Sequence, residues 1–171
     1  LSTLTTGGKF FEGPRWHDGA WWVSDFYRHG VFTIAPDGTE TQVLEVDTQP
    51  SGLGWLPDGR LLVVSMKDQR VLRQETDGTL VTHADLSGLI TGMANDMVVD
   101  DAGRAYVGNF GAATVPGAIH EPAALALVHP DGRAEVAATD LVFPNGSVIT
   151  PDGGTLLVAE TLAARVTAFD I

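Results

Sequence analysis

The chain has 171 residues, 44% of them hydrophobic, and its 10 Lys and Arg against 22 Asp and Glu give a formal net charge of -12. This length suits one domain with a sizeable core, and the apolar content excludes a disordered chain. The absence of cysteine excludes a disulfide framework and thiolate metal sites. An acidic surface repels phosphate, so nucleic acid is not an expected partner, whereas cations and neutral small molecules are.

The sequence offers no sign of a membrane partner. No apolar run approaches the roughly 20 residues that cross a bilayer. The first eight residues, Leu-Ser-Thr-Leu-Thr-Thr-Gly-Gly, lack the charged and apolar regions of a signal peptide. The expected location is therefore the cytoplasm, and the oligomeric state is not indicated.

One turn-and-strand unit recurs four times along the chain. The turns stand 40, 43 and 51 residues apart, at Asp18-Gly19, Asp58-Gly59, Asp101-Ala102-Gly103 and Asp152-Gly153. The β-rich runs that follow them are 20–25, 60–65, 104–109 and 155–160. Asp-Gly between apolar runs is a strong hairpin signal, because glycine adopts a positive φ without steric cost. Each unit therefore begins with a β-hairpin.

Further strands follow each hairpin. Third strands are predicted at 30–35, 70–74, 124–128 and 165–169, and fourth strands at 40–46, 80–86 and 133–141. A four-stranded unit of about 40–45 residues is typical of a β-propeller blade. An open sandwich of short antiparallel strands is the alternative, but it needs no such repeating phase. The predicted fold class is all-β, a β-propeller of four-stranded antiparallel blades, with about four blades in this chain.

The repeat pattern leaves the last blade incomplete. The fourth unit stops after its third strand, at Ile171. Residues 1–10 precede the first inner strand, where they could complete a ring of four blades or belong to a blade beyond Ile171. The expectation is one propeller domain over 1–171, and whether it is complete stays undecided.

The inner strands carry polar residues at one phase. In a propeller these strands converge on the central channel, and aligning the segments before the turns brings together Glu12, Ser51, Asn95 and Asn145. A carboxylate with amide and hydroxyl oxygens suits a hard cation, and the lack of Cys or His at this phase argues against zinc. Asn-Gly and Asn-Asp are also plain turn formers. Both interpretations remain open at this point.

Three motifs resemble one known family. They are Glu-Gly-Pro-x-Trp from Glu12, Asn-Asp from Asn95 with the Asp-x-x-Gly turn at 100–103, and Pro-Asn-Gly from Pro144. In this order, over about 10–171, they resemble the SMP-30/gluconolactonase family, also called regucalcin-like. The resemblance implies a six-bladed propeller with a divalent cation at the channel mouth, usually Ca²⁺ and sometimes Zn²⁺, Mn²⁺ or Mg²⁺. It also implies hydrolysis of sugar-acid lactones or, in a distant branch, of organophosphates.

The resemblance assigns roles residue by residue. Glu12 and Asn145 match metal ligands, Asn95 matches an asparagine that contacts substrate or the metal through water, and Asp96 is its acidic neighbour. The family's aspartate ligand lies one blade after Asn145, and this sequence ends before it. Met93 stands where relatives sometimes carry a basic residue, which weakens the case for an acidic substrate arm. Six blades of this size need roughly 250–300 residues, so the chain matches the N-terminal two-thirds of such a protein.

The expected activity is metal-dependent opening of a lactone, with small-molecule lactones or esters as substrates. A cation would polarise the carbonyl and activate water. Asp96 is the candidate base, although a turn-capping role is equally compatible with its position. The alternatives are another ester or a phosphotriester as substrate, a non-enzymatic calcium-binding or interaction propeller, and a chain inactive for want of the missing ligand.

Other residues are assigned more loosely. The stretch Phe110 to Pro122 interrupts the third unit and suits either a substrate lid or a plain surface loop. Asn109, at the end of a strand, is a candidate substrate-binding residue, and Glu160 at the same phase is a weaker pocket candidate. The four tryptophans, at 16, 21, 22 and 55, are expected to pack between blades.

Overall fold

The computed structural model describes residues 2–112 and 122–171, and every regular element in them is a β-strand. No helix long and apolar enough to cross a membrane occurs in those ranges. The strands form four antiparallel sheets, in which each strand pairs with its neighbour in sequence. Blade 1 is β1 (Phe11–His17), β2 (Ala20–Asp25), β3 (Gly30–Ile34) and β4 (Glu40–Glu45); blade 2 is β5 (Pro50–Trp55), β6 (Leu61–Ser65), β7 (Arg70–Gln74) and β8 (Leu80–Asp85). Blade 3 is β9 (Ala94–Val99), β10 (Ala105–Asn109), β11 (Ala123–Val128) and β12 (Ala134–Leu141); blade 4 is β13 (Pro144–Ile149), β14 (Thr155–Glu160) and β15 (Arg165–Asp170).

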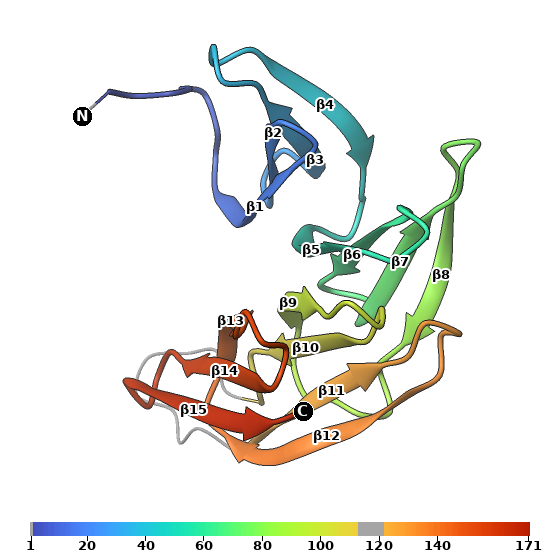
Figure 1. Cartoon of the computed structure of the whole chain (residues 1–171), viewed down its shortest axis with the longest axis vertical. Coiled ribbons are helices and arrows are strands. Elements are labelled where there is room, and N and C mark those ends of the chain that lie inside the picture. Colours follow the sequence, from blue (N-terminus) through green and yellow to red (C-terminus); the bar gives the residue numbers. More distant parts are fainter. Residues whose placement is uncertain (1, 113–121) are drawn as a thin grey trace.

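The four blades follow one another around an arc. Figure 1 shows the first strand of each blade turned toward a common centre, whereas β4, β8 and β12 lie on the outer perimeter. Radial repetition of four-stranded sheets is propeller geometry and not the two facing sheets of a sandwich. The all-β propeller prediction is confirmed, with four blades among the described residues and three strands in the last of them.

The Asp-Gly turns owe their shape to local hydrogen bonds. At Asp58-Gly59 the glycine has a φ of +85°, and Asp58 Oδ1 accepts the backbone N–H of Arg60 at 3.1 Å. The same arrangement recurs at Asp77, whose Oδ1 accepts the N–H of Thr79 at 3.0 Å. These turns need only near neighbours in sequence, which is why the hairpins could be predicted.

The core lies between blades, because each sheet covers the face of the next. All residues of β6 are buried, including four consecutive aliphatic side chains, since blades 1 and 3 cover the two faces of blade 2. In β15, at the end of the arc, four of the six residues are exposed and none is buried. Stacking of sheets therefore replaces the alternating pattern of a half-buried strand with a continuous apolar run.

Glycines let the inner strands approach one another closely. A Cβ on Gly52 of β5 would overlap the backbone nitrogen of Met97 in β9, and one on Gly108 of β10 would overlap the carbonyl of Pro144 in β13. A side chain at either position would separate neighbouring blades near the centre of the arc. β5 thus meets β9, and β10 meets β13, backbone to backbone near the candidate site residues.

The tryptophan prediction is half right. Trp22 and Trp55 pack between blades 1 and 2, with ring centroids 5.5 Å apart. Trp16 and Trp21 are 55% and 41% exposed and contact each other at 5.2 Å. The prediction is wrong for these two, because no blade among the described residues covers the outer face of β1 and β2.

The N-terminal segment does not complete blade 4. Residues 2–10 form no strand, and blade 4 comprises β13, β14 and β15 alone within the described chain. The backbone N–H groups of Lys9 and Phe10 instead donate to Asp25 of blade 1, at 2.7 and 3.1 Å. Residues 2–10 therefore do not supply a fourth strand to blade 4 in this structure.

Candidate functional site

A β-bulge recurs near the start of all four inner strands. Three steps along each inner strand oppose two steps along its partner, as between Pro50 and Leu53 opposite Ser65 and Val63. The equivalent irregularities follow Glu12, Ala94 and Pro144. A bulge inserts one residue and re-aims its side chain, and bulges are frequent beside active sites. The four aligned residues, Glu12, Ser51, Asn95 and Asn145, all lie at these bulges.

Side-chain hydrogen bonds connect three of these residues across blades. Asn95 Nδ2 donates to Asn145 Oδ1 at 2.8 Å, joining blade 3 to blade 4. Ser51 Oγ donates to Asn95 Oδ1 at 3.4 Å, joining blade 2 to blade 3. Asn95 is 2% exposed and Ser51 is fully buried. The structure therefore brings together residues up to 94 positions apart in the sequence.

Glu12 lies beside this network on blade 1. A Cβ added at Gly13 would be 3.1 Å from the Ser51 carbonyl and 3.4 Å from Asp96 Oδ1, which places this part of β1 against β5 and β9. Burial raises the pKa of Glu12, and the charge of Asp96 raises it further, while the backbone N–H of Gly13 lowers it. Two carboxylates near one another in a partly buried place are unfavourable without a neutralising positive charge.

Asp96 receives such a charge from a residue that the sequence did not indicate. Arg15 Nη2 of β1 donates to Asp96 Oδ1 at 2.9 Å and to the Met97 carbonyl at 2.5 Å. Burial raises the pKa of Asp96, and Arg15 and the backbone N–H groups of Met97 and Ser147 lower it in part. No spacing signal links Arg15 to a residue 81 positions later, so only the folded chain reveals the pair.

The side-chain oxygen atoms at this site are of the type that binds a hard cation. Glu12 offers a carboxylate, and the Oδ1 of Asn145 retains a second lone pair beside the one that accepts from Asn95. Carboxylate and amide oxygens are the ligands that Ca²⁺ takes. Within 2–112 and 122–171, no group of three or more Asp, Glu or His side chains is positioned to hold a metal ion. Among the described residues the site therefore combines the carboxylate of Glu12 with the amide oxygens of Asn95 and Asn145.

The ends of the second strands anchor the chain. Asn109 Nδ2 donates to the Ala124 carbonyl at 2.5 Å, and its Oδ1 accepts the N–H of Gly111 at 3.0 Å. Glu160 accepts the N–H of Val142 at 2.7 Å, much as Asp25 accepts the N–H groups of Lys9 and Phe10. These fully buried polar side chains satisfy the backbone where an inner strand begins or a loop departs. Such contacts support structural roles for Asn109 and Glu160.

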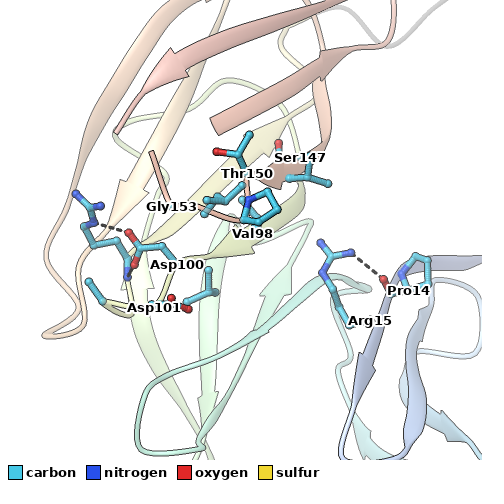
Figure 2. Close-up of a pocket in the computed structure, with 14 residues that line it drawn as sticks. Pro14, Arg15, Val98, Asp100, Asp101, Ser147, Thr150 and Gly153 are labelled. Carbon is cyan, nitrogen blue, oxygen red and sulfur yellow. Dashed lines mark hydrogen bonds and ion pairs between the residues drawn. The ribbon is translucent and has the colours of Figure 1, made fainter. Parts of the chain in front are cut away.

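A cavity lies beyond this network, toward the Asp-Gly turns. It has a volume of about 670 Å³. Figure 2 shows Pro14 and Arg15 on one side of it and Val98, Ser147 and Thr150 on the other. Asn95 and Asn145 are not among its lining residues. The proposed lid, Phe110 to Pro122, falls mostly on residues 113–121, which lie outside the described residues.

Comparison with known proteins gives a family and a fold. The family model described as "SMP-30/Gluconolactonase/LRE-like region" matches residues 10–171. Among solved structures, a gluconolactonase from Xanthomonas campestris is 24% identical with a TM-score of 0.80, over 99% of this chain and 61% of that one. A calcium-binding regucalcin from Agrobacterium tumefaciens is 22% identical with a TM-score of 0.76, over 97% and 55%. A luciferin-regenerating enzyme is 16% identical with a TM-score of 0.79, over 95% and 56%.

These comparisons support conclusions of different scope, about the fold in one case and about the family in the other. No curated protein matches the chain. The chain spans about three fifths of the length of the solved gluconolactonase, so the likeness between structures bears on the fold of that part. The family model, in contrast, covers all three motifs and nearly the whole sequence. The chain therefore belongs to the SMP-30/gluconolactonase/LRE-like family.

Proposed function

We propose that the protein is a metal-dependent hydrolase that opens lactones. The observation that carries the proposal is the hydrogen bond between the Asn95 and Asn145 amides, on bulges of adjacent inner strands, with Glu12 close to Asp96. Membership of the family and the solved gluconolactonases support it. Lactones of sugar acids are the substrates that the resemblance implies.

The residues at the bulges would hold a divalent cation, with Ca²⁺ first and Zn²⁺, Mn²⁺ or Mg²⁺ as alternatives. Glu12 and Asn145 would be direct ligands, and Asn95 would bind the cation or the substrate. The bound cation would supply a Lewis acid that polarises a carbonyl and makes water more acidic. The hydrogen bonds from Ser51 to Asn95 and from Asn95 to Asn145 fix the orientation of both amides before any ligand arrives.

Asp96 is the proposed general base, and two observations bear on it. Its raised pKa brings the carboxyl closer to the range in which a base works near neutral pH. Its Oδ1 is held by Arg15, so this oxygen is committed to an ion pair and the other oxygen would have to take the proton. Asn109 is the second proposed substrate-binding residue, and its use would require release of Gly111 or Ala124.

The test combines metal content with hydrolysis. Purified protein is analysed for bound metal and assayed by pH-stat on a panel of lactones, before and after chelation and after return of Ca²⁺. We expect hydrolysis that chelation removes and the cation restores. Hydrolysis unaffected by chelator would contradict the metal role.

A substitution tests the ligand assignment. Glu12→Gln keeps the size of the side chain and removes the charge, so it should abolish cation binding in calorimetry together with hydrolysis. Glu45→Gln, an exposed position on β4, makes the same chemical change away from the bulges and should alter neither. Tight Ca²⁺ binding by the Glu12 variant would refute the assignment. Cation binding by the unchanged protein without hydrolysis of any lactone, ester or phosphotriester would identify a calcium-binding propeller instead.

A further inference from the structure

In each blade an equivalent backbone hydrogen bond joins the residue that follows the second strand to the residue that precedes the first strand. Phe26 N donates to the Phe10 carbonyl in blade 1 at 3.2 Å, and Phe110 N donates to the Met93 carbonyl in blade 3 at 2.9 Å. Met66 pairs in the same way with Gln49, and Thr161 with Phe143, at 2.9 and 3.1 Å. Six of these eight residues are Phe or Met. We call them the collar: Phe10, Phe26, Met66, Met93, Phe110 and Phe143.

The collar side chains form one apolar surface across the blades. The rings of Phe10 and Phe26 stack with centroids 5.0 Å apart, and those of Phe110 and Phe143 meet edge to face at 4.6 Å, joining blades 3 and 4. Phe26, Met93 and Phe110 all pack against the core between blades 2 and 3, which includes the buried Met66. An apolar strip therefore runs from the first blade to the fourth.

This strip lies next to the polar network. Met93 and Phe143 each stand two residues before Asn95 and Asn145, so their Cα atoms lie within about 7 Å. The collar is only partly covered: Phe10 is 47% exposed, and Met93 and Phe143 are half-buried. Partly exposed aromatic and methionine side chains beside a few convergent polar groups are typical of ligand sites.

The chemistry of the collar disfavours a polyhydroxylated substrate. None of its six side chains carries a hydroxyl, an amide or a charge, and Gln49 and Thr161 are the polar exceptions at the eight positions. Sugar hydroxyls placed against Phe and Met would lose hydrogen bonds to water without replacement. An alkyl or aryl group there would instead gain from leaving water.

We propose that the collar binds an apolar arm of the substrate, so that the protein prefers lactones with an alkyl or aryl substituent to sugar-acid lactones. This inference rests on the proposed lactone hydrolysis and narrows its substrate class. Met93 and Phe110 are the specificity-determining residues, because Met93 lies two residues before Asn95 and the N–H of Phe110 donates to the Met93 carbonyl. The reacting carbonyl would face the amides while the apolar arm lies along the collar.

The test compares lactones of one ring size whose alkyl substituents increase in length. Values of kcat/KM are measured for δ-valerolactone, δ-hexalactone, δ-octalactone and δ-decalactone, with δ-gluconolactone as the polar member. Each methylene that the collar buries should raise kcat/KM about fourfold, and δ-gluconolactone should be the poorest substrate. A flat series, or preference for δ-gluconolactone, would overturn the inference.

Variants connect the trend to the collar. Met93→Gln keeps the side-chain length and makes its end polar, so the increase per methylene should fall to less than half. Phe110→Ala should do the same, with thermal unfolding recorded to confirm a folded protein. Phe169→Ala on β15, a partly buried phenylalanine in the core between blades 3 and 4, should keep the full increase. An unchanged trend in Met93→Gln would refute the role of the collar.

A binding assay separates this inference from the hydrolase proposal. The 2-alkylcyclohexanones have a carbonyl and an alkyl arm but cannot be opened by water. Calorimetry in the presence of Ca²⁺ should show affinity rising with chain length and weakened by Met93→Gln, even if no lactone is hydrolysed. Affinity that rises with chain length in the absence of any hydrolysis would support the collar inference and contradict the lactonase proposal. Affinity that does not depend on chain length would contradict the collar inference.

Discussion

Glu160 offers a quantitative test of how blade 4 is held. Its side chain is 1% exposed and accepts two hydrogen bonds from Arg165, at 2.6 and 2.9 Å, one from Thr167 and one from the N–H of Val142. The ion pair with Arg165 is the main cause that lowers the pKa of Glu160 from 4.5 to about 2, against the opposing effect of burial. One carboxylate therefore connects β14, β15 and the segment before β13.

The magnitude follows from that pKa. Lowering it from 4.5 to about 2 corresponds to a stabilisation on the order of 3 kcal/mol. Arg165 is 55% exposed, so solvent screens the pair and we expect about 2 kcal/mol for Glu160→Gln at pH 7. Since the folded state holds Glu160 ionised, the stabilisation is present above pH 4.5 and is lost as the pH falls toward 2.

The assay is urea unfolding of the protein and of Glu160→Gln at several pH values between 7 and 2.5. The difference in free energy of unfolding should be largest at pH 7 and shrink below pH 4.5. Asp170→Asn, an exposed carboxylate on the same sheet, should change stability by less than about 0.5 kcal/mol. Equal stability of Glu160→Gln and the unchanged protein at pH 7, or a difference independent of pH, would refute the reasoning.

Two further predictions concern contacts between blades. Burial and the neighbouring Arg73 lower the pKa of His83, so the unfolded chain binds the proton more readily than the folded one. The stability should therefore fall as the pH drops below about 6.5, and the melting temperature should decrease less between pH 7.5 and 5.5 in His83→Gln than in the unchanged protein. An equal decrease in both proteins would contradict this. Gly52→Ala should cost about 1–3 kcal/mol in chemical unfolding, because its Cβ overlaps the Met97 nitrogen, whereas Gly146→Ala, at the equivalent bulge with nothing within 4 Å, should be tolerated. Equal losses in both variants would argue against close approach as the cause.

The strands and their order could be predicted from the sequence because their causes are local. The turn at Asp58-Gly59 depends on hydrogen bonds between residues two apart, and β6 is recognisable as a short run of aliphatic residues. Four repeats in phase then indicated the propeller and aligned Glu12 with Asn95 and Asn145. The observed bulges begin at Glu12 in blade 1 and one residue before Asn95 and Asn145 in blades 3 and 4.

The contacts that orient side chains at the site could not be obtained in this way. Arg15 reaches Asp96 across 81 residues, and nothing in a repeat of about 40 residues specifies which side chain crosses from one blade to another. The exposure of Trp16 depends on whether a further sheet covers blade 1, which its own sequence does not encode. Pairing between distant residues is a property of how the blades stack.

The sequence by itself determined the repeating unit, its turns and the phase at which polar residues meet, because each depends on short-range hydrogen bonding and on the alternation of side chains along a strand. Tertiary structure alone decided that Asn95 bonds to Asn145, that Arg15 neutralises Asp96, that Glu160 anchors blade 4, and that six Phe and Met residues form one surface. Those outcomes depend on the stagger and close approach of neighbouring sheets, which bring together residues far apart in the chain.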